Sequence, residues 1–201
     1  MIWLDLARRG KTNWWRYLVA WPLAILIAMV MITVLLAAPI WLHWLPASIT
    51  GDMQSAAHPI VFYGSQGLTF ALFLFGFWAA IRMMHGKRFA DIRGAWSWRS
   101  LMTGMGVWLV VLILLTLIDY VIRPKGFHLS LNLTPVAALV AIVGLLVQTF
   151  TEEFVFRGYL SQSLLLATKN QVVAIILSSL VFGAMHIPNG IPQAVGATIF
   201  G

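Results

Sequence analysis

Residues 135–167 read PVAALVAIVGLLVQTFTEEFVFRGYLSQSLLLA, and this stretch decides the fold class. Apolar residues dominate it, and its formal charges are those of Glu152, Glu153 and Arg157 alone. About 20 consecutive apolar residues in a helix are enough to cross the hydrocarbon core of a bilayer. The stretch is therefore predicted to be a membrane-spanning helix with charged side chains in its interior.

The rest of the chain has the same apolar character. Hydrophobic residues make up 61% of the 201 residues and charged residues only 9%, whereas soluble domains are about half apolar and a quarter charged. So little charge cannot cover a water-exposed surface. We predict an all-α, polytopic transmembrane helix bundle with five spans and the start of a sixth. The spans are expected at residues 17–42, 60–84, 101–122, 135–167 and 171–187, and the sixth apolar segment runs from 191 to Gly201, so we expect a C-terminal truncation.

The net charge of +7 comes from basic residues at the ends of apolar runs, in the N-terminal tail and in the loop 82–99. Basic loops of this kind stay in the cytoplasm, so the N-terminus is predicted to be cytoplasmic. No basic face with interleaved aromatic residues occurs outside these flanks, so the expected partner is the lipid bilayer and no nucleic acid is expected. The polar and aromatic segment 82–100 is expected to be an interfacial surface helix or a loop with a structural role.

Other titratable residues suggest little chemistry. His43, His58, His85 and His128 fall in loops or at the ends of spans, where we expect ordinary solvated histidines. The chain contains no cysteine, which excludes disulfides, a thiol nucleophile and thiolate metal sites.

The adjacent pair Glu152 and Glu153 is expensive in lipid, because a charge at the centre of a span costs about 2.5–3.5 kcal/mol on insertion scales. Arg157 follows Glu153 by four residues and shares its helix face, so it can neutralise that carboxylate. Glu152 points to a different face and is suited to act as a general base. The alternative is a buried ion pair, or a helix end just outside the lipid.

His186 provides a second group, on the same helix face as Phe182. If residues 168–170 form a tight turn, Glu152 and His186 each lie seventeen residues from Lys169. Both would then stand about 25 Å from the turn at 1.5 Å per residue. A carboxylate and an imidazole facing each other across a hairpin form a water-activating pair; the alternative is a histidine at a helix end. Gln148 is expected either to line the same cavity or to bond a neighbouring helix.

Two motifs carry a family resemblance. Residues 152–160, EEFVFRGYL, resemble an E-E-x-x-x-R motif, and residues 182–186, FGAMH, resemble F-x-x-x-H. Both are typical of the CAAX protease and bacteriocin-processing family, also called the ABI family, which includes the type II CAAX prenyl endopeptidases. The resemblance covers about residues 135–190.

The resemblance implies a helical intramembrane peptidase of the bacterial inner membrane that hydrolyses a peptide or protein substrate. Glu152 would activate water, Glu153 and Arg157 would shape its surroundings, and His186 would bind the water or a metal. The cofactor is then a divalent metal such as zinc, or none, since one glutamate and one histidine are too few for a zinc site. Residues 1–134 would form three N-terminal spans with the basic loop, and 135–201 the incomplete core of the peptidase-like domain.

The chain departs from the family pattern at its third motif, a late histidine followed four residues on by Asn or Asp. Asn189 is the nearest polar candidate and is expected first of all to end a helix. Two other functions stay open: a non-catalytic membrane binding or bacteriocin-immunity protein that sequesters a peptide in the same pocket, and a small transporter with the glutamate pair as a proton relay.

Overall fold

The structure is a computed structural model that describes residues 2–55, 57–94, 97–123 and 134–200. All regular elements of this part are helical. They are, in chain order, α1 (Ile2–Arg8), α2 (Trp14–Ile32), η1 (Thr33–Ala37), α3 (Ala38–Trp41), α4 (Ile49–Asp52), α5 (Pro59–His85), α6 (Phe89–Arg93), α7 (Trp98–Ile122), α8 (Pro135–Glu152), η3 (Glu153–Leu160), α9 (Ser161–Thr168), α10 (Gln171–Met185), η4 (Ile187–Asn189) and α11 (Ile191–Phe200). The predicted all-α class is confirmed.

Four helices are long and apolar enough to cross a membrane: Trp14–Trp41, Pro59–His85, Trp98–Ile122 and Pro135–Thr168. They correspond to the first four predicted spans, and they make the chain an integral membrane protein. The fifth predicted span is the apolar helix α10, whose 15 residues would rise only about 22 Å. By length, α10 is therefore too short to cross a hydrocarbon core of about 30 Å alone.

The described chain divides into two compact units. Residues 1–94 and 135–201 form one unit, and residues 95–134, which contain α7, form the other. Residues 135–201 therefore pack with the N-terminal helices. The functional division expected between residues 134 and 135 stays a prediction.

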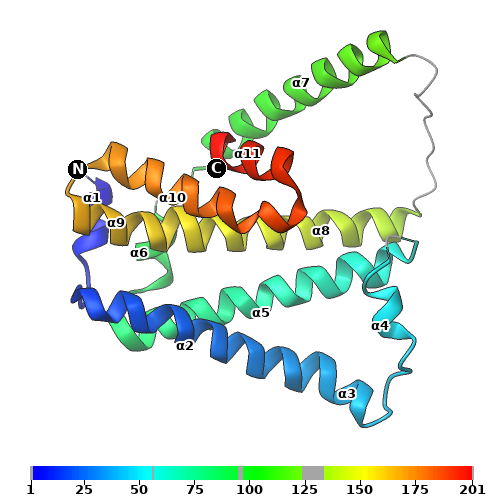
Figure 1. Ribbon diagram of the computed structural model, residues 1–201, viewed down its shortest axis with the longest axis horizontal. Helices are drawn as coiled ribbons and strands as arrows, with labels where there is room; N and C mark the ends of the chain where they lie inside the picture. The colour runs from blue at the N-terminus through cyan, green and yellow to red at the C-terminus, as the bar shows by residue number, and fades with distance from the viewer. Residues whose placement is uncertain (1, 56, 95–96, 124–133, 201) are drawn as a thin grey trace. The chain divides into compact units, whose positions relative to one another are not determined.

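Within the larger unit, α5 lies between α2 and α8 (Figure 1). Small residues allow these helices to approach closely, as is common in membranes, where lipid is as apolar as the helices themselves. Ala20, Ala24 and Ala28 repeat every fourth residue and form the buried stripe of α2. On α5, Gly67 faces Gly144 of α8 so closely that a Cβ atom on Gly67 would lie 2.7 Å from the Cα atom of Gly144.

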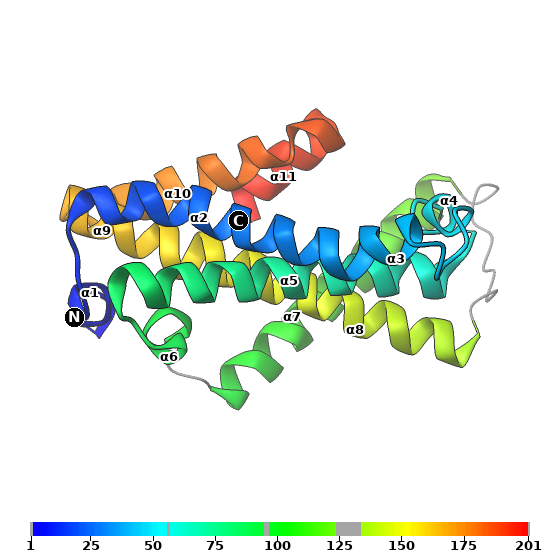
Figure 2. The same ribbon diagram turned by 90° about the horizontal axis from the view of Figure 1, so that it is seen from below.

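The chain then forms a helical hairpin. Lys169 adopts the left-handed conformation that ends α9, with φ of 55°. Asn170 caps α10 through its side-chain oxygen, which accepts from the backbone N–H groups of Val172 and Val173. Helix α10 runs back along η3 and α9, and α11 packs on α10 (Figure 2). The predicted turn at residues 168–170 is present.

The contact between α5 and α8 yields a stability prediction. A Cβ atom on Gly144 would lie 2.5 Å from the backbone oxygen of Tyr63, and overpacking of this kind costs about 1–3 kcal/mol. Gly144→Ala should therefore lower the thermal unfolding temperature in detergent. Gly196→Ala is the matched control, because no atom lies within 4 Å of its added Cβ. Equal stability of the two variants would contradict the packing described.

Candidate active site

The predicted glutamate pair lies where α8 changes into the π-helix η3. Glu152 is the last residue of α8, and Glu153 begins η3. The sequence predicted one continuous span, and the helix is continuous, but its register changes at the motif. In a π-helix the backbone bonds run from i to i+5, and such segments are rare and frequent at functional sites. The backbone N–H of Ser161 accordingly donates to the oxygen of Phe156, five residues earlier.

The ion pair expected between Glu153 and Arg157 is present. Both side chains are about two-fifths exposed. The main effect of the pair is local charge balance. Arg157 neutralises Glu153, which leaves Glu152 as a carboxylate with a different set of neighbours.

Glu152 is oriented by two amide side chains in series, Gln148 on its own helix α8 and Gln66 on the neighbouring helix α5. The Nε2 group of Gln148 donates to Glu152 Oε1 at 3.1 Å, and the Nε2 group of Gln66 on α5 donates to Gln148 Oε1 at 2.9 Å. One residue before Glu152, the hydroxyl oxygen of Thr151 lies 2.8 Å from the backbone oxygen of Val147 and 3.1 Å from that of Phe70 on α5. Gln148 thus makes a hydrogen bond to a neighbouring helix, which was one of its two expected roles. Through Gln148, helix α5 orients the Glu152 carboxylate.

A small cavity of about 10 Å³ lies against both glutamates. This volume is at the lower limit of what one water molecule requires. The cavity opens between η3 and α10. Its lining residues are Glu152, Glu153, Phe156, Arg157, Ser178 and Phe182.

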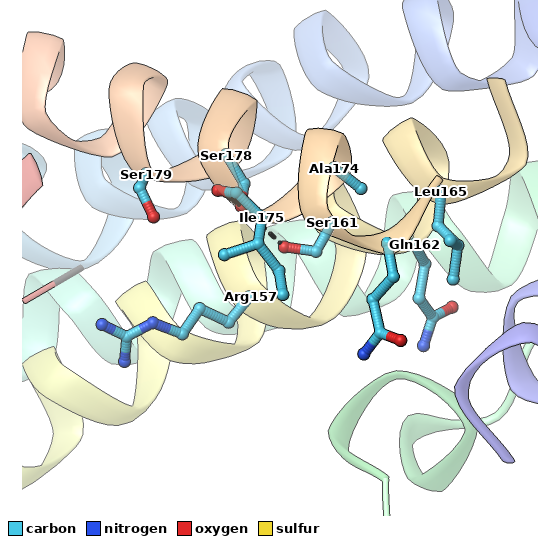
Figure 3. A pocket seen from close by; sticks show the side chains of 9 residues that line it. Arg157, Ser161, Gln162, Leu165, Ala174, Ile175, Ser178 and Ser179 are labelled. Atoms are coloured by element: carbon cyan, nitrogen blue, oxygen red, sulfur yellow. Dashed lines mark hydrogen bonds between the residues drawn. The ribbon is translucent and has the colours of Figure 1, made fainter. Parts of the chain in front are cut away.

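A larger pocket of about 320 Å³ lies beside the small cavity, between η3, α9 and α10 (Figure 3). The two share Arg157 and Ser178 as lining residues. Ser161 and Ser178 meet in this pocket with their hydroxyl oxygens 3.0 Å apart. The remaining lining residues are Gln162, Leu165, Gln171, Ala174, Ile175 and Ser179. The pocket thus has an apolar body with several polar groups, as is usual for a ligand site.

The hairpin register that was predicted holds near the turn. Ser161 and Ser178, eight residues before and nine after Lys169, meet through their hydroxyls. Phe156 and Phe182, thirteen residues before and after Lys169, have ring centroids 5.1 Å apart. Beyond Phe182 the helix α10 ends at Met185.

His186 is the C-terminal cap residue of α10 and is partly buried. Its Nδ1 atom lies 2.9 Å from the backbone oxygen of Phe182, and its ring packs edge-on against the Phe182 ring at 4.6 Å. A carbonyl oxygen can only accept, so Nδ1 carries the proton and Nε2 of the neutral ring keeps a lone pair. Phe182 lines the small cavity with Glu152, whereas His186 lines neither pocket. The direct meeting of Glu152 and His186 stays a prediction.

Asn189 ends the short helix η4 and is exposed. Its backbone N–H donates to the oxygen of His186 at 3.0 Å. Like His186, it lines neither pocket. Asn189 thus lies at the end of a helix, as was first expected.

The donor set does not fit a zinc site. Among residues 2–55, 57–94, 97–123 and 134–200, no three His, Cys, Asp or Glu side chains gather within reach of one ion. Zinc sites in proteins use at least three protein ligands. Glu152 and His186 alone do not provide them.

The expectation of a solvated histidine was wrong for His85. The side chain of His85 is fully buried. Its Nδ1 atom lies 2.6 Å from the backbone oxygen of Lys11, and its Nε2 atom lies 2.8 Å from the hydroxyl of Tyr159 on η3. Apolar flanks at a span end do not distinguish a buried histidine from an exposed one. His43 and His58 are exposed, and His128 lies outside the described residues.

Within the segment 82–100, for which an interfacial surface helix or a loop with a structural role was expected, Lys87 and Asp91 are buried. The Nζ atom of Lys87 donates to the backbone oxygen of Ala7 at 2.9 Å and to Gln162 Oε1 at 2.8 Å. The Nε2 group of Gln162 donates to the backbone oxygen of Asp91 at 2.8 Å. This network joins α1, α6 and α9, and its member Gln162 also lines the larger pocket.

Asp91 adds ionic bonds to the same network. Its carboxylate accepts from Arg9 Nη1 at 2.7 Å and from the backbone N–H of Arg88 at 2.9 Å. Burial alone would raise the pKa of Asp91 above its usual value of 3.8. The hydrogen bonds from Arg88 and Arg9 outweigh this effect and lower the pKa to about 2. Asp91 is therefore ionised at neutral pH and ties the N-terminal tail to α6.

Lys87 gives the network a pH dependence. Burial lowers the pKa of Lys87 from 10.5 to about 8, against an opposing effect of Asp91. Because the unfolded chain binds this proton more tightly than the folded one, the free energy of unfolding should rise between pH 8 and pH 10.5. Thermal unfolding in detergent across this range measures the rise. Lys87→Met should abolish it, and Lys11→Met, at an exposed lysine, should retain it; a rise of equal size in all three proteins would refute the assignment.

Comparison with known proteins supports the resemblance drawn from the motifs. Residues 132–201 match the family model described as type II CAAX prenyl endopeptidase Rce1-like. The match confirms the family resemblance for this segment of the chain. The matched family is a peptidase family, and the match contains both motifs but neither His85 nor Lys87.

A curated relative extends the similarity to most of the chain. The uncharacterized protein YyaK of Bacillus subtilis (strain 168) is 27% identical over 191 residues, which cover 90% of this chain. The chain spans only 63% of the length of that relative. No solved structure matches the chain.

Proposed function

We propose that the chain forms the catalytic part of an intramembrane endopeptidase in which Glu152 activates the attacking water. The observation that carries the proposal is that Glu152, Glu153 and Arg157 line one small cavity between η3 and α10, which adjoins the larger pocket. The Rce1-like match of residues 132–201 supports the reaction class. The N-terminus and the basic loop 82–99 would face the cytoplasm of a bacterial cell.

In this mechanism Glu152 removes a proton from the water as it attacks the carbonyl carbon of the peptide bond. The carbonyl then carries negative charge in a tetrahedral intermediate, and donors aimed at that oxygen lower the barrier. When the C–N bond breaks, the protonated Glu152 returns its proton to the leaving amine. Gln148 keeps the carboxylate oriented through Oε1.

His186 is proposed as the group that positions the water, because it caps α10 four residues after Phe182, which lines the small cavity. With Nδ1 bonded to the backbone oxygen of Phe182, its Nε2 atom can accept a hydrogen bond from that water. The pocket between η3, α9 and α10 would receive the substrate peptide next to the scissile bond, because it adjoins the small cavity at Arg157 and Ser178.

The role of Glu152 is tested by Glu152→Gln, which keeps the shape and removes the base. We expect peptide hydrolysis to fall about 10²–10⁴-fold while peptide binding is retained. The assay follows cleavage of a library of synthetic quenched-fluorescence peptides by the chain in liposomes. Asp119→Asn, at an exposed carboxylate of α7, is the matched control and should keep full activity.

Two outcomes would overturn this proposal. Cleavage by Glu152→Gln at the wild-type rate would exclude Glu152 as the base. Peptide binding by the wild type without any cleavage would favour the non-catalytic, immunity-type function instead.

The role of the larger pocket is tested by two neighbouring isoleucines of similar exposure, 52% for Ile175 and 53% for Ile176. Only Ile175 lines the pocket. Ile175→Trp should fill it and raise KM at least tenfold, while Ile176→Trp should change KM less than twofold. Steady-state kinetics on a peptide found by the library assay measure both, and equal KM values would place the substrate elsewhere.

A further inference from the structure

The π-helix η3 has a reactive face and an anchored face. Glu153, Phe156 and Arg157 are partly exposed and line the small cavity. Phe154, Val155 and Tyr159 are buried in the core, against residues of α2, α5 and α6. Because an isolated π-helix is rarely stable, the orientation of the reactive face depends on contacts made by the anchored one.

The most specific of these contacts is the hydrogen bond between Tyr159 and His85. The backbone oxygen of Lys11 can only accept, so Nδ1 of His85 carries the proton and donates to it. Nε2 of the neutral ring must then be an acceptor, and the Tyr159 hydroxyl donates to it at 2.8 Å. Both side chains are 0% exposed. The bond therefore has one polarity and no competing water, and loss of either partner would leave the other buried and unsatisfied.

The aromatic surroundings hold the same two residues in place. The ring of Tyr17 lies 4.3 Å from the His85 ring and stacks on Tyr159 at 5.5 Å. The Tyr17 hydroxyl, in contrast, is buried with no hydrogen-bond partner within the described part of the chain. Packing and hydrogen bonding can therefore be separated at this site.

A second close contact limits movement of η3. A Cβ atom on Gly158 would lie 2.8 Å from the Ile92 side chain of α6, so the backbone of η3 rests directly on α6. Arg157 and Gly158 immediately precede Tyr159 in η3. A displacement of Tyr159 would therefore shift Arg157 relative to Glu152, whose own helix is fixed on α5 through Gln148.

We propose that His85 and Tyr159 are positioning residues, which hold the π-helix so that Arg157 and Glu153 face the cavity at Glu152. This inference rests on the proposed peptidase function for its kinetic consequence. It assigns a role in the site to α5 and to the N-terminal tail, both of which lie outside the Rce1-like segment.

The kinetic test compares the same substitution at two stacked tyrosines. Tyr159→Phe removes the bonded hydroxyl and should lower kcat at least tenfold, with KM changed less than twofold, because the loss concerns the transition state. Tyr17→Phe removes the unbonded hydroxyl and should leave both constants unchanged. Equal effects of the two variants would overturn the proposal.

The positioning role of His85 is tested by two substitutions, one that removes its hydrogen bonds and one that can replace them. His85→Leu removes the donor and the acceptor and should lower kcat as much as Tyr159→Phe. His85→Gln offers one donor for the Lys11 oxygen and one acceptor for the Tyr159 hydroxyl, and should restore a substantial part of kcat. The Tyr159→Phe, His85→Leu double variant should be no worse than His85→Leu alone, since both substitutions break the same His85–Tyr159 bond; additive losses would contradict the shared bond.

A readout independent of activity separates this proposal from the peptidase assignment. Amide hydrogen exchange of residues 153–160 should accelerate in Tyr159→Phe and not in Tyr17→Phe, since a loosened π-helix opens more often. If that result appears in a protein that cleaves no peptide, the positioning role stands and the peptidase function fails. Unchanged exchange in Tyr159→Phe would overturn the positioning role whatever the activity.

Discussion

The structure depends on the placement of two carboxylates in a helix that is otherwise apolar. Lipid offers no hydrogen bonds, so each charge needs a partner within the protein. Glu153 forms an ion pair with Arg157, one turn later in the helix. Glu152 accepts a hydrogen bond from the amide of Gln148, one turn earlier. The two partners lie on opposite sides of the pair along the chain. The adjacent glutamates consequently have different surroundings, which is the condition for different roles.

The arrangement of the helices could be largely predicted from the sequence. Long apolar runs bounded by basic residues predict spans, because a helix of about 20 apolar residues matches the thickness of the hydrocarbon core. The turn at Lys169 and Asn170 could be placed because it separates two such runs, and the observed contact between Phe156 and Phe182 agrees with the antiparallel hairpin that this turn implies. These predictions depend on periodicity and length, which are local properties of the sequence.

The details of the site could not be predicted in the same way. A change from α- to π-helical register at Glu153 leaves no mark in apolar periodicity, and the estimate of equal height for Glu152 and His186 assumed a uniform rise. The burial of His85 and Lys87 depends on the N-terminal tail folding back over the end of α5, where Lys11 and Ala7 present backbone oxygens. A backbone acceptor has no sequence signature, so partners of this kind are visible only in three dimensions.

The network behind η3 also changes what the family match can explain. Residues 132–201 contain the candidate site residues, namely Glu152, Glu153, Arg157 and His186. The anchored face is held by residues that precede the match, and its bonds are directional: the histidine tautomer set by Lys11 determines which nitrogen receives the Tyr159 hydroxyl. The π-helix η3 can present its charged side chains in a fixed direction only if its anchored face makes one defined set of contacts. The N-terminal helices therefore contribute to the geometry of the candidate site as well as to anchorage in the membrane.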